Sequence, residues 1–396
     1  MRIQTDILIS GGGVAGLTAA AGFGSAGFAV FCVEPTAPVT EATAPGADLR
    51  TTAFLTPSIP VLAAAGIWPR LAPHAAALQI MRIVDAGGKA QEPRQIHDFD
   101  AAELSDQPFG YNLPNWLLRR EMLARLAELP NVSFLPGLAT TTLLTREDSA
   151  LVTLSDGRQV EAKLVIAADG RASTMRTAAG IAVKTLRYGQ RALNFAVTHA
   201  APHQNISTEI HRSGGPFTLV PLPAIAGQPA SAVVWMETGP EAQRLMDLPD
   251  TAFEAEINAR SCLILGPLTL ASRRASWPII SQLAQQMAGQ RVALMAEAAH
   301  VVPPIGAQGL NMSLADLNCL LTLAQEMPLG SAAMLRAYHM RRHTEVTARV
   351  LGIDALNRAS MARAPVLRDL RAMGLSVLHG MAPVRRTLMR AGLGLR

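Results

Sequence analysis

The sequence predicts an α/β protein in which a Rossmann-like domain is interrupted by an antiparallel-sheet domain and followed by a C-terminal helical segment. Three observations support this prediction. A strand, a glycine-rich turn, a helix and a second strand follow one another within the first 34 residues. Short β-rich pieces separated by proline and glycine turns fill residues 181–275. From Ala332 onward the pattern is helical throughout.

Composition narrows the class of protein. The chain has 396 residues, 49% hydrophobic and 16% charged, which excludes a disordered chain and is enough for about two to three domains. Its three cysteines (Cys32, Cys262 and Cys319) are far apart, so we expect neither a disulfide framework nor a cysteine-based metal site, and a cytoplasmic compartment fits best. No apolar run reaches the roughly 18 residues of a membrane span, and no targeting segment precedes the first strand.

We expect the chain to divide into four segments. The first domain covers residues 1–180, with an excursion into the second domain near 76–107. The antiparallel β domain covers 181–275, a segment that closes the first domain covers 276–330, and a basic helical region covers 331–396.

The N-terminal unit consists of apolar strands at 6–10 and 29–33 with a small-residue helix at 17–27 between them. The turn after the first strand reads Gly11-x-Gly13-x-x-Gly16, and the second strand is closed by Glu34. This order of strand, glycine turn, helix, strand and acid is typical of a dinucleotide site.

Each of these residues has a physical reason to be there. Gly11 permits the tight turn, Gly13 lets a pyrophosphate approach the backbone, and Gly16 lets the helix pack closely on the strand. Glu34 would accept hydrogen bonds from a ribose hydroxyl and would disfavour a 2′-phosphate. The motif therefore favours FAD or NAD over NADP.

Later elements follow from local signals. The stretch 117–129 is rich in Leu, Met and Ala and predicts a helix that Pro130 ends. Asp156-Gly157 lies between two apolar runs and predicts a hairpin. Further strands are expected at 194–197, 217–220, 232–236 and 292–295, and a long apolar helix at 310–327.

Two further blocks carry chemistry. In the first, an apolar strand over 164–168 ends in Asp169-Gly170, with Ser173 and Arg176 following. The second runs from Arg291 through Ala296-Glu297-Ala298-Ala299-His300, then Pro303-Pro304-Ile305-Gly306-Ala307-Gln308-Gly309-Leu310-Asn311, to Asp316. It reads as a strand, a loop that fixes backbone N–H groups, and a helix whose positive end faces something anionic.

The three blocks in this order resemble the class A, single-component FAD aromatic hydroxylases, and most closely the ubiquinone-biosynthesis hydroxylases of the UbiH/UbiF/VisC family. The resemblance spans the whole chain, with further matches at Asp48–Ala53, Tyr188-Gly189-Gln190, Gly215-Pro216 and Val234-Trp235. It implies a Rossmann-like FAD-binding domain of the class A flavoprotein monooxygenase type, with the antiparallel sheet as substrate domain. It also implies a monooxygenase that uses NAD(P)H and O₂ to hydroxylate a polyprenylated phenol.

The resemblance also implies roles for individual residues. Gly11, Gly13, Gly16 and Glu34 would hold the AMP half of FAD, and Arg50 would lie near the pyrophosphate. Arg120 or its neighbour Arg119 matches the arginine on the helix beside the FAD, and Asp169 would serve both FAD and the nicotinamide cofactor. The family has Gly-Asp where this chain has Ala296-Glu297; Glu297 can still accept the bond from the ribityl chain. The remaining flavin-loop positions are Pro304, Gly306, Gln308, Gly309, Leu310 and Asn311.

Several side chains allow two interpretations. His300 could assist proton transfer, although a hydrogen-bonded structural histidine is the more common case. Tyr188, Gln190 and Pro221 are candidates for substrate contact, with strand packing as the alternative. His339 and His343 have helical spacing but lack the acid of a metalloprotease motif, so we expect no metal site.

The C-terminal region is strongly basic. Residues 331–396 carry twelve arginines and three acidic residues. A basic amphipathic helix suits an anionic membrane surface, and the alternatives are a solvated cap, a contact within a biosynthetic complex or a homo-oligomer interface. Aromatic residues make up 4% of the chain and no nucleic-acid-binding signature is present, so we expect no nucleic-acid partner.

Two rival functions remain open from the sequence. One is a hydroxylase of a small soluble phenol, and the other is a low-turnover, FAD-containing, lipid-binding subunit of a biosynthetic complex. The expected location is the cytoplasm, with peripheral contact to the inner face of the cytoplasmic membrane if the basic region binds lipid.

Overall fold

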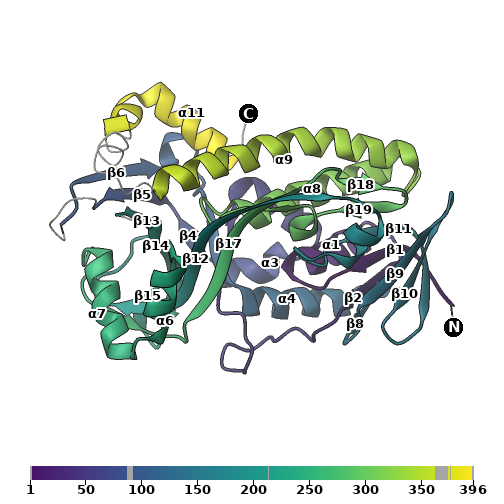
Figure 1. Cartoon of the computed structure of the whole chain (residues 1–396), viewed down its shortest axis with the longest axis horizontal. Coiled ribbons are helices and arrows are strands. Elements are labelled where there is room, and N and C mark those ends of the chain that lie inside the picture. Colours follow the sequence, from purple (N-terminus) through teal and green to yellow (C-terminus); the bar gives the residue numbers. More distant parts are fainter. Residues whose placement is uncertain (1, 87–91, 213, 362–372, 375, 395–396) are drawn as a thin grey trace.

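The computed structural model describes residues 2–86, 92–212, 214–361, 373–374 and 376–394. Two lobes lie side by side, each built on one large sheet, and the long helix α9 (Ala332–Ser360) runs across both (Figure 1). Residues 87–91 of the expected excursion and 362–372 of the expected helical region lie outside the described residues.

The first lobe contains an eight-stranded sheet with a parallel centre, in the order β8-β2-β1-β11-β19. The apolar runs of the sequence form these strands because they are buried on both faces: Ile7, Leu8 and Ile9 are fully buried. The strands are β1 (Arg2–Ser10), β2 (Val30–Glu34), β8 (Val132–Pro136), β9 (Thr140–Thr145), β10 (Ala150–Leu154), β11 (Gln159–Ala167), β18 (Ala288–Gly289) and β19 (Val292–Leu294).

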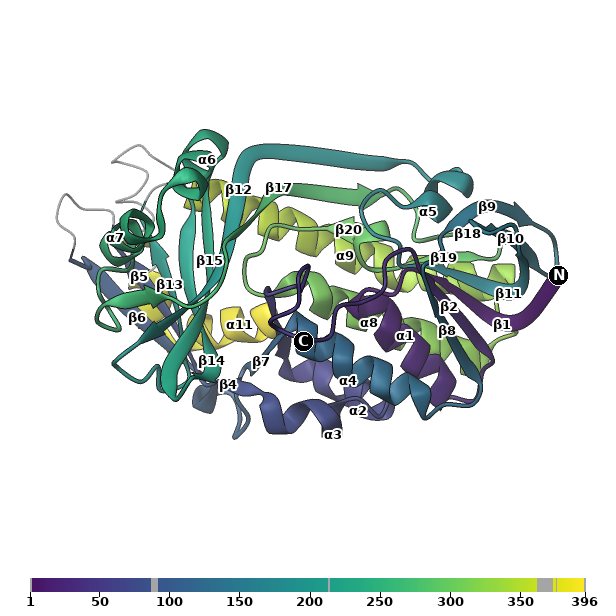
Figure 2. The ribbon, with the colours of Figure 1, turned by 90° about the horizontal axis from the view of Figure 1, so that it is seen from below.

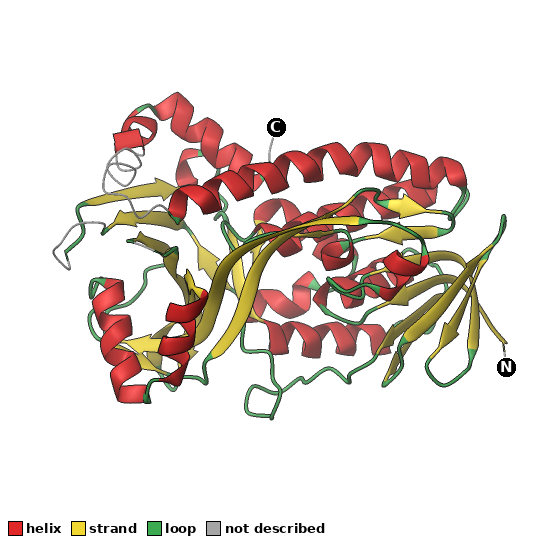
Figure 3. Ribbon diagram, viewed as in Figure 1, coloured by secondary structure: helices red, strands yellow, loops and turns green. Residues whose placement is uncertain are grey.

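Helices cover this sheet (Figure 3). Helix α1 packs on both α4 and α8, and α8 packs on α9. The helix expected at 117–129 and the one expected at 310–327 each begin two residues earlier than the apolar pattern indicates. The helices of this lobe are α1 (Val14–Ser25), α2 (Ile59–Ala64), α3 (Trp68–Leu71), α4 (Asn115–Ala127), α5 (Thr174–Ala178) and α8 (Gln308–Glu326), with 3₁₀ turns η1 (Thr56–Ser58), η2 (Ala72–His74) and η4 (Ala296–Ala298). A further 3₁₀ turn, η3 (Ala101–Glu103), belongs to the second lobe.

The second lobe contains a nine-stranded sheet in the order β20-β17-β12-β15-β14-β13-β5-β6, with β16 paired to β12. Strands β5 and β6 come from the stretch 76–107 and join the sheet through a parallel pairing of β5 with β13. The strands are β5 (Ile80–Asp85), β6 (Gln95–Asp100), β12 (Val183–His199), β13 (Ile206–His211), β14 (Pro216–Ile225), β15 (Gln228–Thr238), β16 (Leu268–Leu270), β17 (Ala275–Ala284) and β20 (His300–Val301).

The two faces of the second sheet differ. One face, here called the outer face, packs on α6 (Gly239–Asp247) and α7 (Asp250–Ser261) through a buried core that includes Leu193, Trp235 and Phe253. The other, the inner face, carries the alternate residues of the same strands, among them Ala192 and Met236. Side-chain alternation therefore places two separate buried clusters on the two faces of this sheet.

Strands β12 and β17 connect the lobes (Figure 2). They pair from Val183 with Ala284 to Asn194 with Ala275, interrupted by a bulge between Arg187 and Arg191. Gly189, inside this bulge, has a φ of +68°, which glycine adopts without strain. A small sheet formed by β3 (Thr51–Leu55), β7 (Gly110–Pro114) and β4 (Ala76–Leu78) lies beside β14.

Helix α11 (Ala382–Leu393) returns from the second lobe to the first (Figure 2). At the second lobe, Arg385 forms an ion pair with Glu103 of η3 at 2.8 Å. At the first lobe, the Gly392 carbonyl accepts a hydrogen bond from Gln308 Nε2 at 2.9 Å. The C-terminal helix thus ties both lobes to the N-terminus of α8.

Candidate functional site

The glycine turn after β1 forms a cradle with one open side. A Cβ atom on Gly11 would lie 2.4 Å from the Ala168 carbonyl oxygen, and one on Gly16 would lie 1.9 Å from the Gly11 carbonyl oxygen. A Cβ on Gly13 would meet no atom within 4 Å. Gly13 is also the N-cap of α1 and provides no side-chain cap, so the first N–H groups of a 12-residue helix face this open space. Such a cradle suits a diphosphate.

Glu34 stands at the edge of the same cradle. Its Oε2 accepts a hydrogen bond from the Gly12 N–H at 2.6 Å, which fixes the carboxylate at the end of β2. A carboxylate in this position can accept further hydrogen bonds from ribose hydroxyls.

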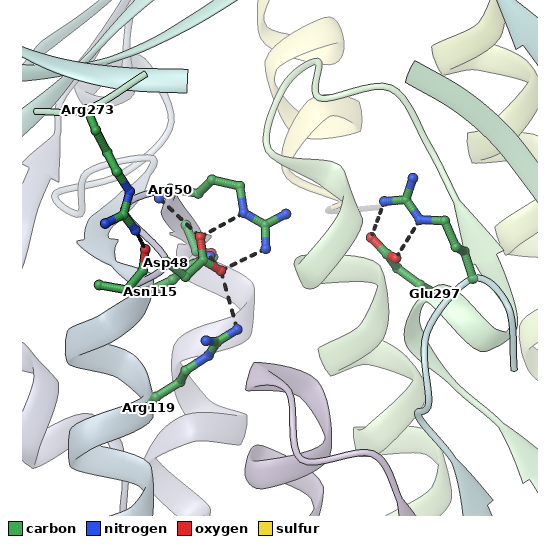
Figure 4. A network of polar contacts seen from close by, with 9 residues as sticks. Asp48, Arg50, Asn115, Arg119, Arg273 and Glu297 are labelled. Atoms are coloured by element: carbon green, nitrogen blue, oxygen red, sulfur yellow. Dashed lines mark hydrogen bonds and ion pairs between the residues drawn. The ribbon is translucent and has the colours of Figure 1, made fainter. Parts of the chain in front are cut away.

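An arginine cluster surrounds Asp48, in the segment between β2 and β3 (Figure 4). Asp48 accepts hydrogen bonds from Arg50 Nε at 2.8 Å, Arg50 Nη2 at 2.7 Å and Asn115 Nδ2 at 3.1 Å, and lies 3.4 Å from Arg119 Nη2. Burial alone would raise the pKa of Asp48, but the hydrogen bonds and charges of Arg50, Asn115 and Arg119 outweigh it and hold the pKa below its usual value. Two arginines share one carboxylate, so the cluster keeps a net positive charge for an anion.

The structure separates the two arginines that the sequence left as alternatives. Arg119 joins the Asp48 cluster. Arg120 instead lies over the Trp116 ring at 5.4 Å and bonds Glu121 at 2.9 Å, because consecutive residues project from a helix about 100° apart. Of the two, Arg119 is the one that joins the cationic cluster.

Glu297 lies across from this cluster. Figure 4 shows the Arg50 guanidinium on the side of the cluster that faces Glu297, and the Glu297 charge helps to raise the pKa of Arg50 after the larger effect of its hydrogen bond to Asp48. The carboxylate of Glu297 pairs with Arg171 at 3.3 Å and is 47% exposed. An exposed carboxylate opposite a cationic cluster fits a cofactor that has both a polyol chain and a diphosphate.

Asp169 organises the second motif. It accepts hydrogen bonds from the Ser173 hydroxyl and, at 3.1 Å, from the Met175 N–H, and so shapes the start of α5. Arg176 then donates to the Ala298 carbonyl at 2.9 Å, which ties this motif to η4. Arg176 was part of the sequence motif, but its link to residue 298 is a long-range contact that spacing does not reveal.

The third motif forms the loop before α8. Pro304 and Gly306 lie in this loop, and Gly309, Leu310 and Asn311 begin the helix. Asn311 Oδ1 accepts from the Leu55 N–H at 2.9 Å and the Ser58 hydroxyl at 2.7 Å, while Nδ2 donates to the carbonyls of Ala53 and Ala307. The amide of Asn311 is thus occupied in holding the loop, and the N-terminus of α8 has no side-chain cap.

Gln308 and His300 support this loop from two sides. Gln308 donates to the Gly306 and Gly392 carbonyls, and its Oε1 accepts from Arg349 Nη1 at 2.9 Å. His300 is buried and bonds Asp316 Oδ2 through Nε2 at 2.6 Å. Asp316 in turn accepts from Arg342 Nε at 2.8 Å. The His300 ring is thus held through Nε2, while its Nδ1 is buried and has no hydrogen-bond partner among the described residues.

The three candidate substrate residues occupy different positions. Tyr188 bonds Asp354 at 2.7 Å and Ser281 at 2.8 Å, and burial followed by the Asp354 contact raises its pKa to about 12. Gln190 is bonded to Asn357 and to the Gly214 carbonyl. Pro221 lies on the outer face by strand alternation, and its carbonyl accepts from Asn112. Tyr188 and Gln190 therefore connect β12 to α9.

An apolar wall does face the flavin-loop motif. Ala192, Met236 and Ile279 form a buried cluster on the inner face of the second sheet, and Ile305 of the loop packs against it. The loop and the sheet thus meet at an apolar surface of the kind that can hold an aromatic ring. Within the part of the chain that the structure describes, no group of three or more metal-ligating side chains is found.

Known proteins resemble this chain in sequence along nearly its whole length. A family model described as FAD binding domain matches residues 4–351. The ubiquinone hydroxylase UbiL of Rhodospirillum rubrum is 34% identical over 98% of this chain and 89% of its own length. The 3-demethoxyubiquinol 3-hydroxylase of Escherichia coli is 28% identical over 99% of both chains.

Solved structures share the fold. The p-nitrophenol 4-monooxygenase PnpA of Pseudomonas putida superposes with a TM-score of 0.78 at 18% identity, covering 100% of this chain and 99% of its own. PqsL of Pseudomonas aeruginosa superposes with a TM-score of 0.74 at 23% identity, covering 91% of this chain and 97% of its own.

Proposed function

The chain belongs to the FAD binding domain family, in its branch of ubiquinone-biosynthesis hydroxylases, and from that premise we propose that it hydroxylates the aromatic ring of a polyprenylated phenol with NAD(P)H and O₂. The observation that carries the proposal is the 34% identity to UbiL along nearly the whole length of both chains. Two features of the structure support the proposal. The glycine turn after β1 suits a dinucleotide, and Ala192, Met236 and Ile279 form an apolar wall beside the loop before α8.

Three groups of residues would each bind a different part of FAD. The cradle at Gly11–Gly16 and Glu34 would hold the AMP half, the Asp48 cluster with Arg50 and Arg119 would neutralise the pyrophosphate, and Glu297 would bond the ribityl chain. Bound there, FAD supplies the redox chemistry by which NAD(P)H and O₂ place one oxygen atom on the ring.

The protein's own contribution is positioning and electrostatics. The uncapped N-terminus of α8 and the N–H groups of residues 309–311 would present partial positive charge to the ring end of a bound FAD. Ile305 and the Ala192–Met236–Ile279 wall would exclude water from the ring of the substrate. The substrate ring would therefore lie between this wall and the loop.

The experiment that tests this function is mass spectrometry of quinone lipids from cells lacking the protein. We expect a prenylated phenol short of at least one ring hydroxyl to accumulate, and its mass to identify the blocked step. A normal ubiquinone profile, together with purified protein that hydroxylates only soluble phenols, would overturn the assignment in favour of a small-phenol hydroxylase. Purified protein whose NAD(P)H oxidation no phenol stimulates would point to the low-turnover subunit.

We also propose that the protein works at an anionic membrane surface, because such a substrate is dissolved in the bilayer. None of the helices in the described part of the chain has the length and hydropathy that a bilayer crossing requires. The C-terminal segment exposes Met381 and Leu388 to solvent, with Arg386 and Arg390 beside them. Exposed apolar side chains interleaved with arginines suit adsorption to acidic lipid.

Vesicle co-sedimentation tests this surface. We expect binding to phosphatidylglycerol-containing vesicles that falls several-fold in Leu388→Glu. The control is Leu144→Glu in β9 of the first lobe, where the leucine is 54% exposed against 45% for Leu388. Equal binding by both variants, or equal binding to neutral vesicles, would overturn the surface.

A further inference from the structure

Strand β13 carries an acid–imidazole pair that the proposed function does not yet use. Glu209 Oε1 accepts a hydrogen bond from His211 Nε2 at 2.7 Å, and the two side chains are only 9% and 13% exposed. Among the described residues, His211 Nδ1 is buried and has no hydrogen-bond partner. A buried imidazole nitrogen without a partner is uncommon in folded proteins and calls for a functional explanation.

The pair lies on the inner face of the second sheet. Glu209 pairs with Thr218, Thr218 with Val234, and Val234 with Asn194, so these residues form one row across four strands. Val234 packs on the wall formed by Ala192, Met236 and Ile279, which Ile305 of the flavin loop also touches. The residue between the pair, Ile210, belongs instead to the core of the outer face.

The pairing of β13 with β14 and of β14 with β15 also determines the distance between His211 and the wall. Neighbouring strands lie about 4.8 Å apart, so the backbone of β13 is about 10 Å from that of β15. His211 is two residues further along than Glu209, opposite Pro216 at the start of β14. An aromatic ring placed beside the partly buried Val234 would, together with the His211 side chain, span this gap.

The other titratable side chains considered in this sheet each have at least one hydrogen-bond partner. The Tyr188 hydroxyl is bonded to Asp354 and Ser281. His300 is bonded to Asp316. His199 is bonded to Ser231 and to the Ala201 carbonyl. Within the described part of the chain, His211 and His300 each keep a buried ring nitrogen without a partner, and the Glu209–His211 pair is the one whose row across the inner face includes Val234 of the wall.

We propose that His211, held by Glu209, accepts the proton of the ring hydroxyl of the substrate. The inference rests on the proposed function. Because Nε2 carries the proton bonded to Glu209, the lone pair of Nδ1 is available as the acceptor. A phenol has a pKa near 10, so its hydroxyl is protonated at neutral pH and its ring is less electron-rich than that of the phenolate.

The transfer is balanced. The O–H bond breaks, its electron pair remains on the ring oxygen, and an N–H bond forms at Nδ1. The Glu209 carboxylate neutralises the resulting imidazolium. The proton returns to the ring oxygen once the new hydroxyl is in place, so the pair ends the reaction in its starting state.

The test compares two phenols that differ in acidity. One is a short-chain prenylated phenol, and the other is the same compound with ring fluorines that make it largely ionised at neutral pH. We expect His211→Asn to lower kcat about 100-fold on the first phenol, as removal of a general base does, and less than about tenfold on the fluorinated one. KM and FAD content should be unchanged.

Two further variants keep the test decisive. Glu209→Gln retains shape and should show the same selectivity with a smaller loss, about tenfold. His199→Asn, in the same sheet, should treat both phenols alike. Equal losses on both phenols in His211→Asn, or no loss on either, would overturn the role of His211. A wild-type protein that hydroxylates neither phenol would overturn the proposed function itself.

Discussion

The turn between β1 and α1 and the loop between β20 and α8 both lead from a strand into the uncapped N-terminus of a helix. In the turn, the left-handed residue is a glycine, Gly11, with a φ of +103°. In the loop, a left-handed glycine, Gly306, is followed by a left-handed alanine, Ala307, at +55°. A second left-handed alanine, Ala296, lies in η4 just upstream.

The two segments keep their shapes by different means. The turn is fixed by close backbone approaches, because any Cβ at Gly11 or Gly16 would overlap a carbonyl group. The loop is fixed by side chains that reach distant segments: Asn311 contacts β3, and Gln308 contacts α9 and α11. Steric requirements of the first kind are local, whereas hydrogen bonds of the second kind depend on the completed fold.

The largest expected effect separates two glycines within the turn. Gly16→Ala should destabilise the fold by about 3 kcal/mol or more, since the new methyl group would overlap backbone that cannot move away. Gly13→Ala should leave the stability of the FAD-free protein within about 0.5 kcal/mol, because its Cβ enters open space at an ordinary φ of −67°.

Thermal unfolding of the FAD-free protein and titration with FAD distinguish these outcomes. Gly13→Ala should lose FAD affinity at least tenfold while it unfolds normally, since the methyl group takes the space into which the pyrophosphate would approach. If Gly13→Ala unfolds normally and binds FAD as tightly as the wild type, the open side of the cradle is not where the cofactor binds.

Asn311 provides the corresponding test in the loop. Asn311→Ala removes four hydrogen bonds and should cost about 2–4 kcal/mol of stability, because partly buried backbone groups lose their partners. Asn318→Ala, on an exposed position of the same helix, is the control and should change little. Urea unfolding measures both. An Asn311 variant as stable as the wild type would mean that the loop is held by other contacts.

The next effect concerns charge instead of shape. Arg119→Ala should weaken FAD binding about tenfold or more, since a hydrogen bond to a charged group contributes about 1.5–3 kcal/mol. Arg120→Ala, one residue away but paired with Glu121, should stay within about twofold. Fluorescence titration with FAD compares them directly. The reverse order of the two affinities would place the cofactor on the other side of α4.

The contrast between local steric requirements and long-range hydrogen bonds also explains which parts of the site could be predicted from the sequence. Gly11, Gly13, Gly16 and Glu34 lie within one strand–turn–strand unit, so spacing was enough to find the cradle. The family assignment was likewise predicted from motif order and is confirmed by the match over residues 4–351.

Contacts between segments that are far apart along the chain could not be predicted from the sequence. The difference between Arg119 and Arg120 depends on the rotation of α4, and the bonds of Tyr188 and Gln190 depend on partners about 165 residues away in α9. Glu209 and His211 gave no motif at all. An acid and a histidine two residues apart were their only signal, no strand was expected at 206–211, and the register of β13 was needed to place the pair on one face of the sheet.

The smallest expected effect has the opposite sign. A non-glycine residue in the left-handed region costs about 1–3 kcal/mol, and glycine loses about 0.5–1 kcal/mol through its greater freedom when unfolded. Ala307→Gly should therefore stabilise the protein slightly, whereas Ala315→Gly, in the regular part of α8, should destabilise it by about 1 kcal/mol.

Because Asn311 Nδ2 bonds the Ala307 carbonyl at 2.6 Å, the gain should be larger in the Asn311→Ala background, where the strained residue has lost its support. Urea unfolding of the four proteins of this double-mutant cycle measures the coupling. Strictly additive changes would show that Ala307 is held by the backbone of the loop, as in the glycine turn, and the contrast between the two segments would disappear.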